Sequence, residues 1–302
     1  MTAVEPIVDP ATVCNVCGTC APAALAQPTA VRCNVRCFRH QTFHVWRCPQ
    51  CASIHAVEDV DLDVYYASYP KFPVDTERVR HGAFKGMLRR LVSAGLEPHH
   101  RILDYGCAAG ALVRYFGDRG FSHVSGYDPY TPGLDDPSVL ARRYDCVVSQ
   151  DVIEHVAAPL ELLERFDALT EPGGLIAIGT PDAAAIDLRS PEAYVHPLHV
   201  PYHRHILSAA ALREAGKRRG WSLERYYPTM YGNTLVPMEN TRFGLHYMES
   251  HDNCLDLLTE PVKMNSWRLW SPVGWFFAAF GYFFDRQTDV QFMFRKRGAP
   301  AS

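Results

Sequence analysis

The stretch Arg101-Ile-Leu-Asp-Tyr-Gly-Cys-Ala-Ala-Gly110 decides the fold class of this chain. Its short apolar run ends at Asp104, and the turn that follows carries Gly106 and Gly110. Residues 111–116 then place apolar side chains at helical spacing, so the stretch predicts a strand, a glycine turn and a helix. Glycine has no Cβ, which lets the backbone of such a turn approach a nucleotide-like ligand at the helix N-terminus. The Gly-x-Gly-x-x-Gly fingerprint of nicotinamide-cofactor proteins is not matched.

Two further predicted strands place polar side chains beside this turn. The strand His123-Val-Ser-Gly-Tyr-Asp128 ends in an acid that can accept two hydrogen bonds from a ribose diol. The strand from Tyr144 to Asp151 runs directly into Glu154 and His155. Ligands of open parallel sheets bind outside the carboxyl ends of the strands, so we expect the functional site where these segments end.

In these segments the chain resembles the class I S-adenosylmethionine-dependent methyltransferases, in particular the group of the ubiquinone-pathway O-methyltransferases. The resemblance extends over residues 76–228, and the matching motifs are Ile102–Gly110, Gly126–Asp128, Tyr144–Val156 and Leu169–Pro181. It implies an α/β fold with a Rossmann-like methyltransferase sheet of seven strands in the order 3-2-1-4-5-7-6. Because only 15 residues separate Asp128 from Tyr144, we expect the third strand to be reduced or absent.

The resemblance also implies S-adenosyl-L-methionine as the methyl donor. Carried over onto this sequence, the motif positions expected to contact it are Asp104, Gly106, Cys107, Ala108, Gly110, Asp128, Pro129, Gln150 and Asp151. Ala108 replaces the middle glycine of the family motif. The adenine contact does not transfer, because the loop that would carry it is shortened here; Asp135 and Asp136 lie in that loop.

Histidines follow the predicted strands at the place where an acceptor should bind. Methyl transfer from a sulfonium needs an aligned nucleophile and, for a hydroxyl acceptor, a base that removes the proton. Imidazole titrates near neutrality and suits that task. We therefore expect the base among His155, His199 and His203, of which the last two belong to a run that also contains His196 and His205. The alternatives are that Glu154 and His155 only hold their loop, and that the run is a polar surface loop.

A divalent metal is a further implication of the resemblance. In the ubiquinone-type relatives, an acid, a glutamate and a histidine at the positions of Asp151, Glu154 and His155 are linked to metal dependence. A metal such as Mg²⁺ would bind both oxygens of a catechol-like acceptor and lower the pKa of a hydroxyl.

The N-terminal residues carry two CxxC motifs, Cys14-Asn-Val-Cys17 and Cys48-Pro-Gln-Cys51. Each motif places two thiolates on one tight turn, and four thiolates complete the tetrahedral shell of a structural Zn²⁺. The alternating, β-rich segment 30–46 between them predicts the hairpin of a zinc ribbon. We therefore expect a zinc-ribbon module over residues 1–60. A second site remains an alternative to stray thiols for Cys20, Cys33 and Cys37 with His40 and His44.

The rest of the chain divides into a linker at 61–75 and a methyltransferase domain at 76–302. The linker contains Tyr65-Tyr-Ala-Ser-Tyr69, which either lines the pocket or packs between the two parts. An aromatic-rich insertion at about 229–288 interrupts the domain and contains Trp267, Trp270 and the run Val273–Phe284. That run is too short to span a bilayer. It predicts a core or dimer helix, with a lid over an aromatic acceptor and a membrane-surface helix as alternatives.

Composition limits the possible partners. The chain has 302 residues, and its 30 basic against 33 acidic residues give a net charge of −3, whereas nucleic-acid-binding proteins usually carry a basic surplus. Its ten cysteines, with no secretory signal in the polar first ten residues, predict a reducing compartment, the cytoplasm. We expect a small-molecule acceptor, no nucleic acid, no transmembrane segment and a possible homodimer.

The sequence thus predicts a methyltransferase that acts on a small molecule, at a hydroxyl oxygen with a histidine base. One alternative is a sugar-nucleotide C-methyltransferase, since small zinc ribbons precede the same domain in some of those enzymes. A second is an RNA-modifying methyltransferase, since zinc ribbons often bind nucleic acid. A scaffold without catalytic activity is the third.

Overall fold

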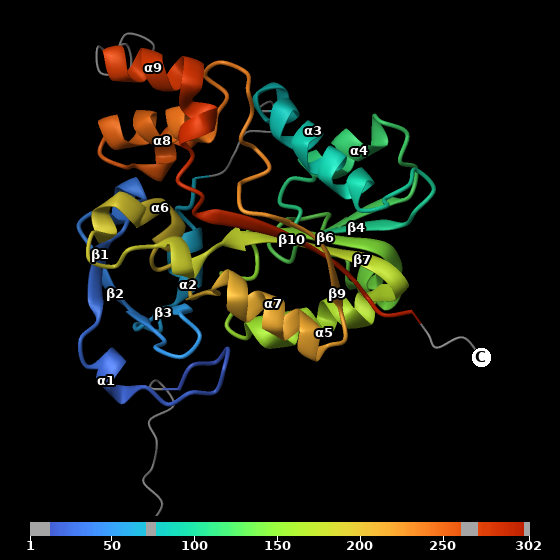
Figure 1. Cartoon of the computed structure of the whole chain (residues 1–302), viewed down its shortest axis with the longest axis horizontal. Coiled ribbons are helices and arrows are strands. Elements are labelled where there is room, and N and C mark those ends of the chain that lie inside the picture. Colours follow the sequence, from blue (N-terminus) through green and yellow to red (C-terminus); the bar gives the residue numbers. More distant parts are fainter. Residues whose placement is uncertain (1–12, 71–76, 261–270, 299–302) are drawn as a thin grey trace, which may run out of the picture.

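A computed structural model describes residues 13–70, 77–260 and 271–298 (Figure 1). Its centre is a six-stranded sheet in the order β5-β4-β6-β7-β10-β9. These strands are β4 (Ile102–Tyr105), β5 (Val124–Tyr127), β6 (Tyr144–Gln150), β7 (Thr170–Pro181), β9 (Ser222–Tyr227) and β10 (Asp289–Arg295). The first four in the sheet are parallel, and β10 lies antiparallel between β7 and β9.

This order is the predicted methyltransferase sheet without its third strand. Between β5 and β6 the chain forms only the short 3-10 helix η4 (Pro137–Ala141), capped by the Asp136 carboxylate, which accepts from Ser138 N. The connection is too short for a further strand with its helices. The fold class is therefore confirmed, with the third strand absent from the part of the chain that the structure describes.

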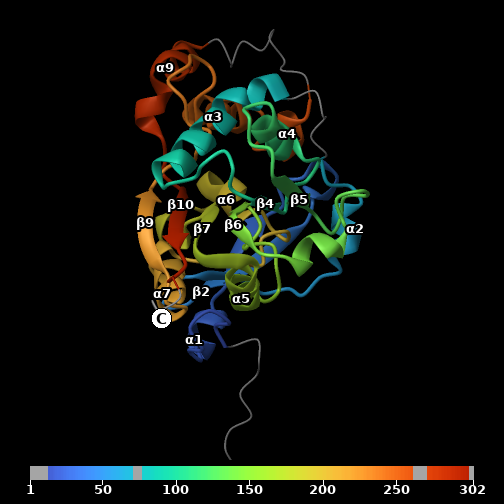
Figure 2. The same cartoon turned by 90° about the vertical axis from the view of Figure 1, so that its right-hand side faces the viewer.

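Helices cover both faces of the sheet (Figures 1 and 2), and the inner strands accordingly bury apolar side chains toward both faces. On one face α3 (Glu77–Ser93) and α4 (Ala111–Gly117) pack over Ile102 and Val148. On the other, α5 (Pro159–Leu169) and α7 (Ala209–Arg218) pack over Leu103 and Val147. Because helices cover both faces, a polar ligand can reach this sheet only at the ends of its strands.

A second, smaller sheet contains the predicted ribbon hairpin. Its order is β1-β2-β3-β8, with β1 (Thr29–Arg32), β2 (Thr42–Arg47), β3 (Ile54–Ala56) and β8 (His205–Ile206), all antiparallel. The short helix α1 (Pro22–Leu25) precedes β1. β8 comes from the chain after β7, so the larger domain supplies the fourth strand of the ribbon sheet. The apolar cluster here also mixes both parts: Val31, Val45 and Ile54 pack with Leu198 and Tyr202.

The predicted linker is partly helical. α2 (Leu62–Tyr66) begins after Asp61, whose carboxylate accepts from Asp63 N. The tyrosines of this segment pack against the ribbon-sheet cluster, while residues 71–76 lie outside the described ranges. The segment therefore connects the two parts by packing as well as by covalent continuity.

The predicted insertion forms a helical layer above the ribbon (Figure 1). It contains α8 (Thr241–Ser250), η7 (Leu255–Leu258), α9 (Pro272–Phe280) and η8 (Gly281–Phe284). The Asn240 side chain accepts from Phe243 N at 2.8 Å and donates to Phe277 O at 3.0 Å, which joins α8 to α9. Trp267 and Trp270 lie outside the described residues.

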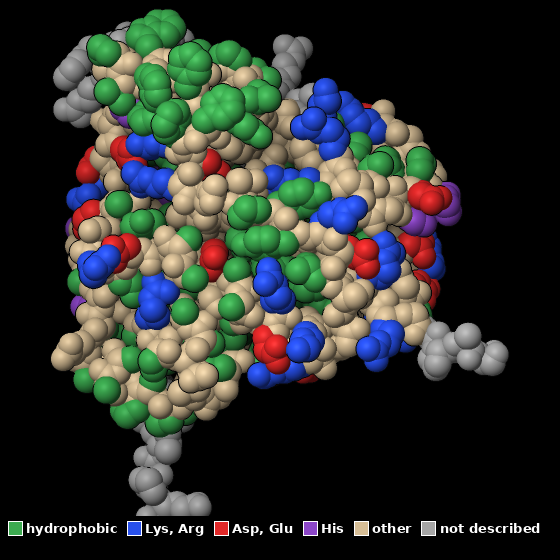
Figure 3. Space-filling view, viewed as in Figure 1, with side chains coloured by type: hydrophobic (Ala, Val, Ile, Leu, Met, Phe, Trp, Pro, Cys, Tyr) green, Lys and Arg blue, Asp and Glu red, His purple; other side chains and the backbone are tan. Residues whose placement is uncertain are grey.

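Helix α9 buries small residues and exposes most of its large aromatic ones, which is the opposite of a core helix. Its small residues Gly274 and Ala278 are buried, whereas Trp275 is 57% exposed and Phe280 52% exposed. Figure 3 shows an apolar area at the top of the molecule, where α9 lies in Figure 1. The core-helix interpretation is therefore wrong for this face. The lid, dimer and membrane-surface interpretations remain predictions. Among the described helices, none is long and apolar enough to cross a membrane.

Candidate functional site

The glycine turn between β4 and α4 is held in a left-handed backbone conformation. The φ angles of Gly106, Ala108 and Gly110 are +80°, +47° and +73°. A Cβ at position 106 would lie 2.3 Å from the Val152 side chain, so only glycine fits there. Ala108 adopts a positive φ without being glycine, at the position where the family motif has one.

Asp128, at the tip of β5, closes this turn. One carboxylate oxygen accepts from Ala108 N and the other from Tyr130 N, both at 2.9 Å. Each oxygen of a carboxylate has a second acceptor position, so hydroxyl groups of a ligand can still donate to it. The turn and this acid form a cradle that matches the requirements of a nucleoside with a ribose diol.

The predicted cofactor residues all lie at the carboxyl ends of three neighbouring strands, β4, β5 and β6. Asp104 lies in the fully buried strand β4, and its burial, with the charge of Asp128 nearby, raises its pKa to about 7. Burial likewise raises the pKa of the Cys107 thiol to about 12. On β6, Gln150 Nε2 donates to the Asp151 carboxylate at 2.9 Å. Pro129 lies exposed on the loop after Asp128.

The predicted histidines meet beside the ends of β6 and β7 in a buried cluster, here called the histidine nest: His155, His199 and His203 with Tyr66, Tyr69 and Tyr202. The rings of His155 and His203 are 4.6 Å apart, and those of His199 and His203 are 5.0 Å apart. His199 is 4% exposed and His203 8% exposed. The alternative of a polar surface loop is therefore wrong for these two residues.

Each nest histidine has one ring nitrogen fixed by a partner. His203 Nδ1 donates to Pro197 O at 2.8 Å, and His199 Nδ1 lies 2.7 Å from Asn34 Oδ1. His155 Nδ1 lies 2.9 Å from the Tyr66 hydroxyl. These contacts set the ring orientations and leave the Nε2 atom of His199 buried without a partner in the described structure.

Burial keeps the nest imidazoles neutral. It lowers the pKa of His155 to about 4 and the pKa values of His199 and His203 well below the usual range. Burial, aided by Asp151, raises the pKa of Glu154 well above its usual range. Neutral imidazoles at pH 7 can accept a proton from a hydroxyl that binds among them.

Glu154 borders the nest, and one of its two carboxylate oxygens accepts a hydrogen bond. Its Oε2 accepts from the Thr180 hydroxyl at 3.0 Å, while Oε1 is buried without a hydrogen-bond partner and lies 3.9 Å from His203 Nε2. Glu154, His155 and His203 each offer a ligand atom within 4.8 Å of the others. Asp151 is not part of this group, so the geometry favours His203 in place of Asp151 as the third member of a metal set.

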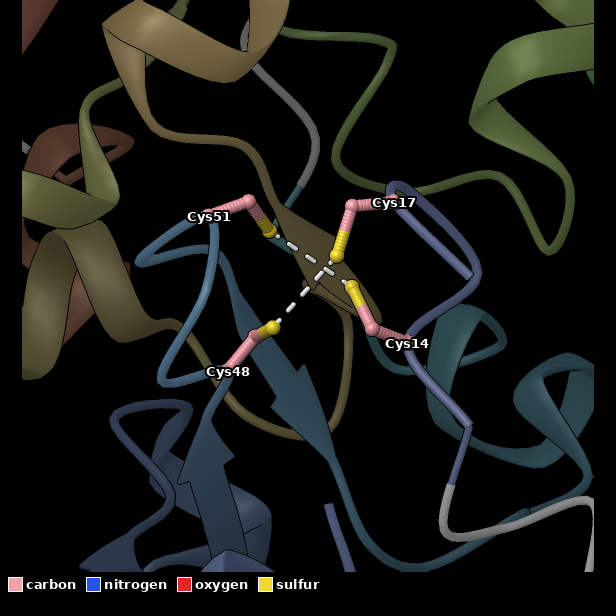
Figure 4. A group of neighbouring side chains, drawn as sticks. All are labelled: Cys14, Cys17, Cys48 and Cys51. Atoms are coloured by element: carbon pink, nitrogen blue, oxygen red, sulfur yellow. Dashed lines mark hydrogen bonds between the residues drawn. The ribbon is translucent and has the colours of Figure 1, made fainter. Parts of the chain in front are cut away.

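The four predicted zinc ligands converge at the base of the ribbon (Figure 4). Cys14 Sγ lies 3.6 Å from Cys51 Sγ, and Cys17 Sγ lies 3.6 Å from Cys48 Sγ. Zn–S bonds of about 2.3 Å in a tetrahedron require sulfur separations of roughly this size. Hydrogen bonding from Cys14 lowers the pKa of Cys51 to about 4. The chemistry and spacing of the set therefore suit Zn²⁺, and Cys20, Cys33 and Cys37 do not join it.

Comparison with known proteins places these features in a family. Residues 77–226 match a family model described as a methyltransferase domain. The chain contains a methyltransferase domain. This domain carries the glycine turn, Asp128 and all three nest histidines. The ribbon cysteines, Tyr66, and helices α8 and α9 lie outside the matched range.

Curated relatives of the methyltransferase domain are ubiquinone biosynthesis O-methyltransferases. That of Rhodopseudomonas palustris strain BisB18 is 28% identical over 128 residues, which are 36% of this chain and 50% of the relative. That of strain TIE-1 is 30% identical with the same coverage. The chain thus spans about half the length of the curated relatives it matches.

Solved structures similar to this chain include two S-adenosylmethionine enzymes. Phosphoethanolamine N-methyltransferase 2 of Haemonchus contortus has a TM-score of 0.48 at 15% identity, with 82% of this chain and 62% of that one covered. A methyltransferase of Mesorhizobium loti has a TM-score of 0.41 at 14% identity, with 70% and 98% covered.

Two contacts of the nest histidines were not predicted from the sequence. The partner of His199 is Asn34 of the ribbon hairpin, and the partner of His155 is specifically Tyr66 among the tyrosines of the linker. Asn34 carries no motif that could have indicated its role. The tyrosine cluster at 65–69 could be recognised in the sequence as a candidate pocket lining. In the structure it packs between the ribbon and the methyltransferase domain, and Tyr66 and Tyr69 belong to the nest.

Proposed function

We propose that this protein transfers the methyl group of S-adenosylmethionine to a hydroxyl of a small molecule, with His155 as the base. The observation that carries the proposal is the Tyr66–His155 contact, which places a phenolic hydroxyl on a neutral imidazole beside the glycine turn. S-adenosylmethionine would supply an activated methyl group on a positively charged sulfur. The chain then has to bind this donor, align the acceptor and take its proton.

The glycine turn supports donor binding. Gly106 and Gly110 bring backbone to the ligand, and Asp128 presents acceptor oxygens toward the same turn. The buried carboxyl groups of Asp104 and Asp289, each with a pKa raised to about 7 by burial, add acidic groups that favour a cationic ligand. The set therefore suits a nucleoside with a ribose diol and a positive charge.

The hydrogen bonds of His155 support its role as the base. Its Nδ1 faces the Tyr66 hydroxyl at 2.9 Å. With the proton of the neutral ring on Nε2, Nδ1 carries the lone pair and accepts from Tyr66. An acceptor hydroxyl would transfer its proton to that atom, either in the place of the phenol or through it. Burial keeps the imidazole neutral, although the lowered pKa also makes it a weaker base than a free histidine.

The experiment that tests the proposal measures methyl transfer to a panel of phenols, catechols and aliphatic alcohols. With a productive acceptor, His155→Ala should lower kcat by roughly 10²–10⁴-fold and leave donor affinity nearly unchanged. His196→Ala is the matched control, because His196 is a half-buried histidine whose pKa is likewise lowered by burial but which is not part of the nest. Equal rates for His155→Ala and wild type would contradict the base assignment.

A metal-assisted reaction is the second candidate, favoured by the convergence of Glu154, His155 and His203. Two imidazoles and a carboxylate suit Mn²⁺, Fe²⁺, Co²⁺ or Zn²⁺ better than Mg²⁺, which prefers oxygen ligands. A metal there would lower the pKa of an acceptor hydroxyl. A metal at Nδ1 of His155 would have to displace Tyr66, as would an acceptor hydroxyl that takes the place of the phenol.

Chelation separates the two candidates if the ribbon metal is monitored at the same time. Activity that disappears with a chelator and returns with Mn²⁺ or Zn²⁺, while the zinc content of the ribbon stays constant, would establish the metal-assisted reaction. Activity that persists after chelation would support the histidine base.

Two other functions have their own tests. Transfer to carbon of a sugar nucleotide would give a methylated product resistant to demethylation. An RNA-modifying enzyme would show salt-dependent retention on heparin.

A further inference from the structure

His55, on β3 of the ribbon, lies between the cysteine cluster and the nest. It is 3% exposed, and its Nε2 lies 3.2 Å from Cys14 Sγ. Its other ring nitrogen, Nδ1, lies 3.1 Å from Nδ1 of His205, its register partner on β8. His205 lies two positions after the nest residue His203. Side-chain contacts therefore run from the sulfur of Cys14 through His55 to His205, in the segment 199–208 that carries His199 and His203.

Ser208, at the end of the segment 199–208, provides a second attachment of this segment to the cysteine cluster. Its hydroxyl donates to Cys51 O at 2.6 Å, and its backbone N donates to Ser53 Oγ at 3.2 Å. Ser53 Oγ in turn accepts from Cys51 Sγ at 3.3 Å. Ser208 also caps α7 by accepting from Ala211 N. The turn that carries Cys48 and Cys51 therefore holds both the end of the loop and the start of the next helix.

The opposite side of the same segment contacts the β6 loop. The backbone nitrogens of Arg204 and His205 donate to Glu154 O at 2.8 and 3.2 Å. Residues 199–208, here called the histidine loop, therefore lie between the cysteine cluster and the Glu154–His155 pair. The glycine turn is held differently, by hydrogen bonds from Gly106 N and Cys107 N to Tyr127 O and by the Asp128 carboxylate.

We infer that the metal-bound ribbon is a positioning device for the acceptor side of the site, and that His55 links the metal cluster to the histidine loop. Four-cysteine sites fold with their metal, so the turns at Cys14 and Cys48 keep their shape only while it is bound. Partners that hydrogen-bond to metal ligands orient them and typically change metal affinity by about 10–100-fold. His55 would do so for Cys14, with His205 as its support.

This inference rests on the proposed function only where it assigns the histidine loop to the acceptor side of a methyltransferase site. The mechanical coupling of metal, His55 and residues 199–208 would hold whatever the acceptor is. It also assigns the ribbon a role inside the chain, so that no nucleic acid or protein partner is needed to account for its presence.

The test compares His55→Ala with His44→Ala. His44 is a ribbon histidine on β2 that pairs with Glu58 and is not in contact with the cysteines in the described structure. For His55→Ala we expect zinc release to a chelating dye to be roughly 10–100-fold faster. We also expect faster amide exchange in residues 199–208. S-adenosylmethionine affinity, measured by calorimetry, should stay within about twofold of wild type because the glycine turn has its own supports. His44→Ala should match wild type in all three measurements.

Chelation of wild-type protein provides a test that does not depend on the folding of a variant. Removing the metal should raise amide exchange in residues 199–208 and leave exchange in the glycine turn unchanged. Unchanged exchange in the histidine loop after metal loss would overturn the inference, as would a simultaneous loss of donor binding, which would show general unfolding. None of these readouts uses methyl transfer, so failure to find an acceptor would count against the proposed function alone.

Discussion

The hydroxyl of Tyr66 lies 2.9 Å from Nδ1 of His155, so a residue that precedes the methyltransferase domain touches the proposed base. Tyr66 also stacks on Tyr130, which follows the ribose-binding candidate Asp128, with ring centroids 5.8 Å apart. One side chain thus contacts both the proposed donor side and the proposed acceptor side of the site. The domain needs the segment before it to complete the nest.

Tyr66→Phe isolates the contribution of this hydroxyl. The ring and its stacking remain, but His155 loses its partner, so we expect kcat to fall by at least roughly tenfold with little change in donor affinity. Tyr65→Phe is the matched control, because the Tyr65 hydroxyl instead donates to Gln41. A steady-state comparison of kcat and KM measures the effect. Equal loss in both variants would indicate a packing effect and not a role at His155.

Asp128→Ala should weaken the binding of S-adenosylmethionine. The substitution removes the carboxylate that ribose hydroxyls would donate to and frees Ala108 N, so we expect a loss of about 1.5–3 kcal/mol. Asp136→Ala is the control, since Asp136 caps the exposed helix η4. Calorimetry with unchanged affinity in Asp128→Ala would remove this residue from the donor site.

The preference for S-adenosylmethionine over S-adenosylhomocysteine should increase with pH. Asp104 and Asp289 have pKa values raised to about 7, so they are largely neutral at pH 6 and largely ionised at pH 8. An ionised carboxyl attracts the sulfonium of the donor, whereas the demethylated product has no such charge. The ratio of the two dissociation constants, measured from pH 6 to 8, should change in favour of the donor. In Asp104→Asn the change should be smaller.

The free energy of unfolding should fall below pH 6.5 because of buried neutral histidines. The pKa values of His155 and His196 are lowered to about 4 in the folded chain, while unfolded histidine titrates near 6.5. Between those values the unfolded chain binds more protons, so stability is present above pH 6.5 and lost as the pH falls toward 4. Denaturant titrations at pH 5 and 6.5 should differ less for His196→Asn than for wild type. No difference between the two proteins would contradict this account.

One zinc per chain should co-purify with the protein. Cys14, Cys17, Cys48 and Cys51 form one cluster, and the other ribbon cysteines are separate from it. Elemental analysis of protein prepared without chelators measures the stoichiometry. A value near two would indicate a second site, either at Glu154, His155 and His203 or at Cys20, Cys33 and Cys37, and a value of zero would contradict the zinc ribbon.

Strong local patterns could be predicted from the sequence. The glycine turn around Gly106, the acid at the end of β5 and the paired cysteines follow from spacing alone, because neighbouring residues determine each of them. The absence of the third strand followed from the short connection before Tyr144. These features needed no knowledge of distant contacts.

Contacts between distant segments could not be predicted in this way. The two-residue strand β8 has no periodic pattern, so nothing in the sequence indicated that His205 would pair with His55. The burial of His199 depends on Asn34, which lies 165 positions earlier in the chain. In α9, an apolar run indicated a helix but not its orientation. Its inward face is set by Asn240 and the close packing of Gly281 against that side chain.

The outward aromatic face of α9 and the adjoining η8 has a consequence for how the molecule behaves in solution. Phe283 is 70% exposed and Trp275 57% exposed, and no charged residue interrupts the sequence from 272 to 284. Salts that are excluded from protein surfaces strengthen the tendency of such a face to leave water. The protein should therefore bind a phenyl column at modest ammonium sulfate concentration and elute earlier when Phe283 is replaced by serine. With a net charge of only −3 to oppose association, the aromatic face of α9 and η8 would then govern how the protein associates in solution.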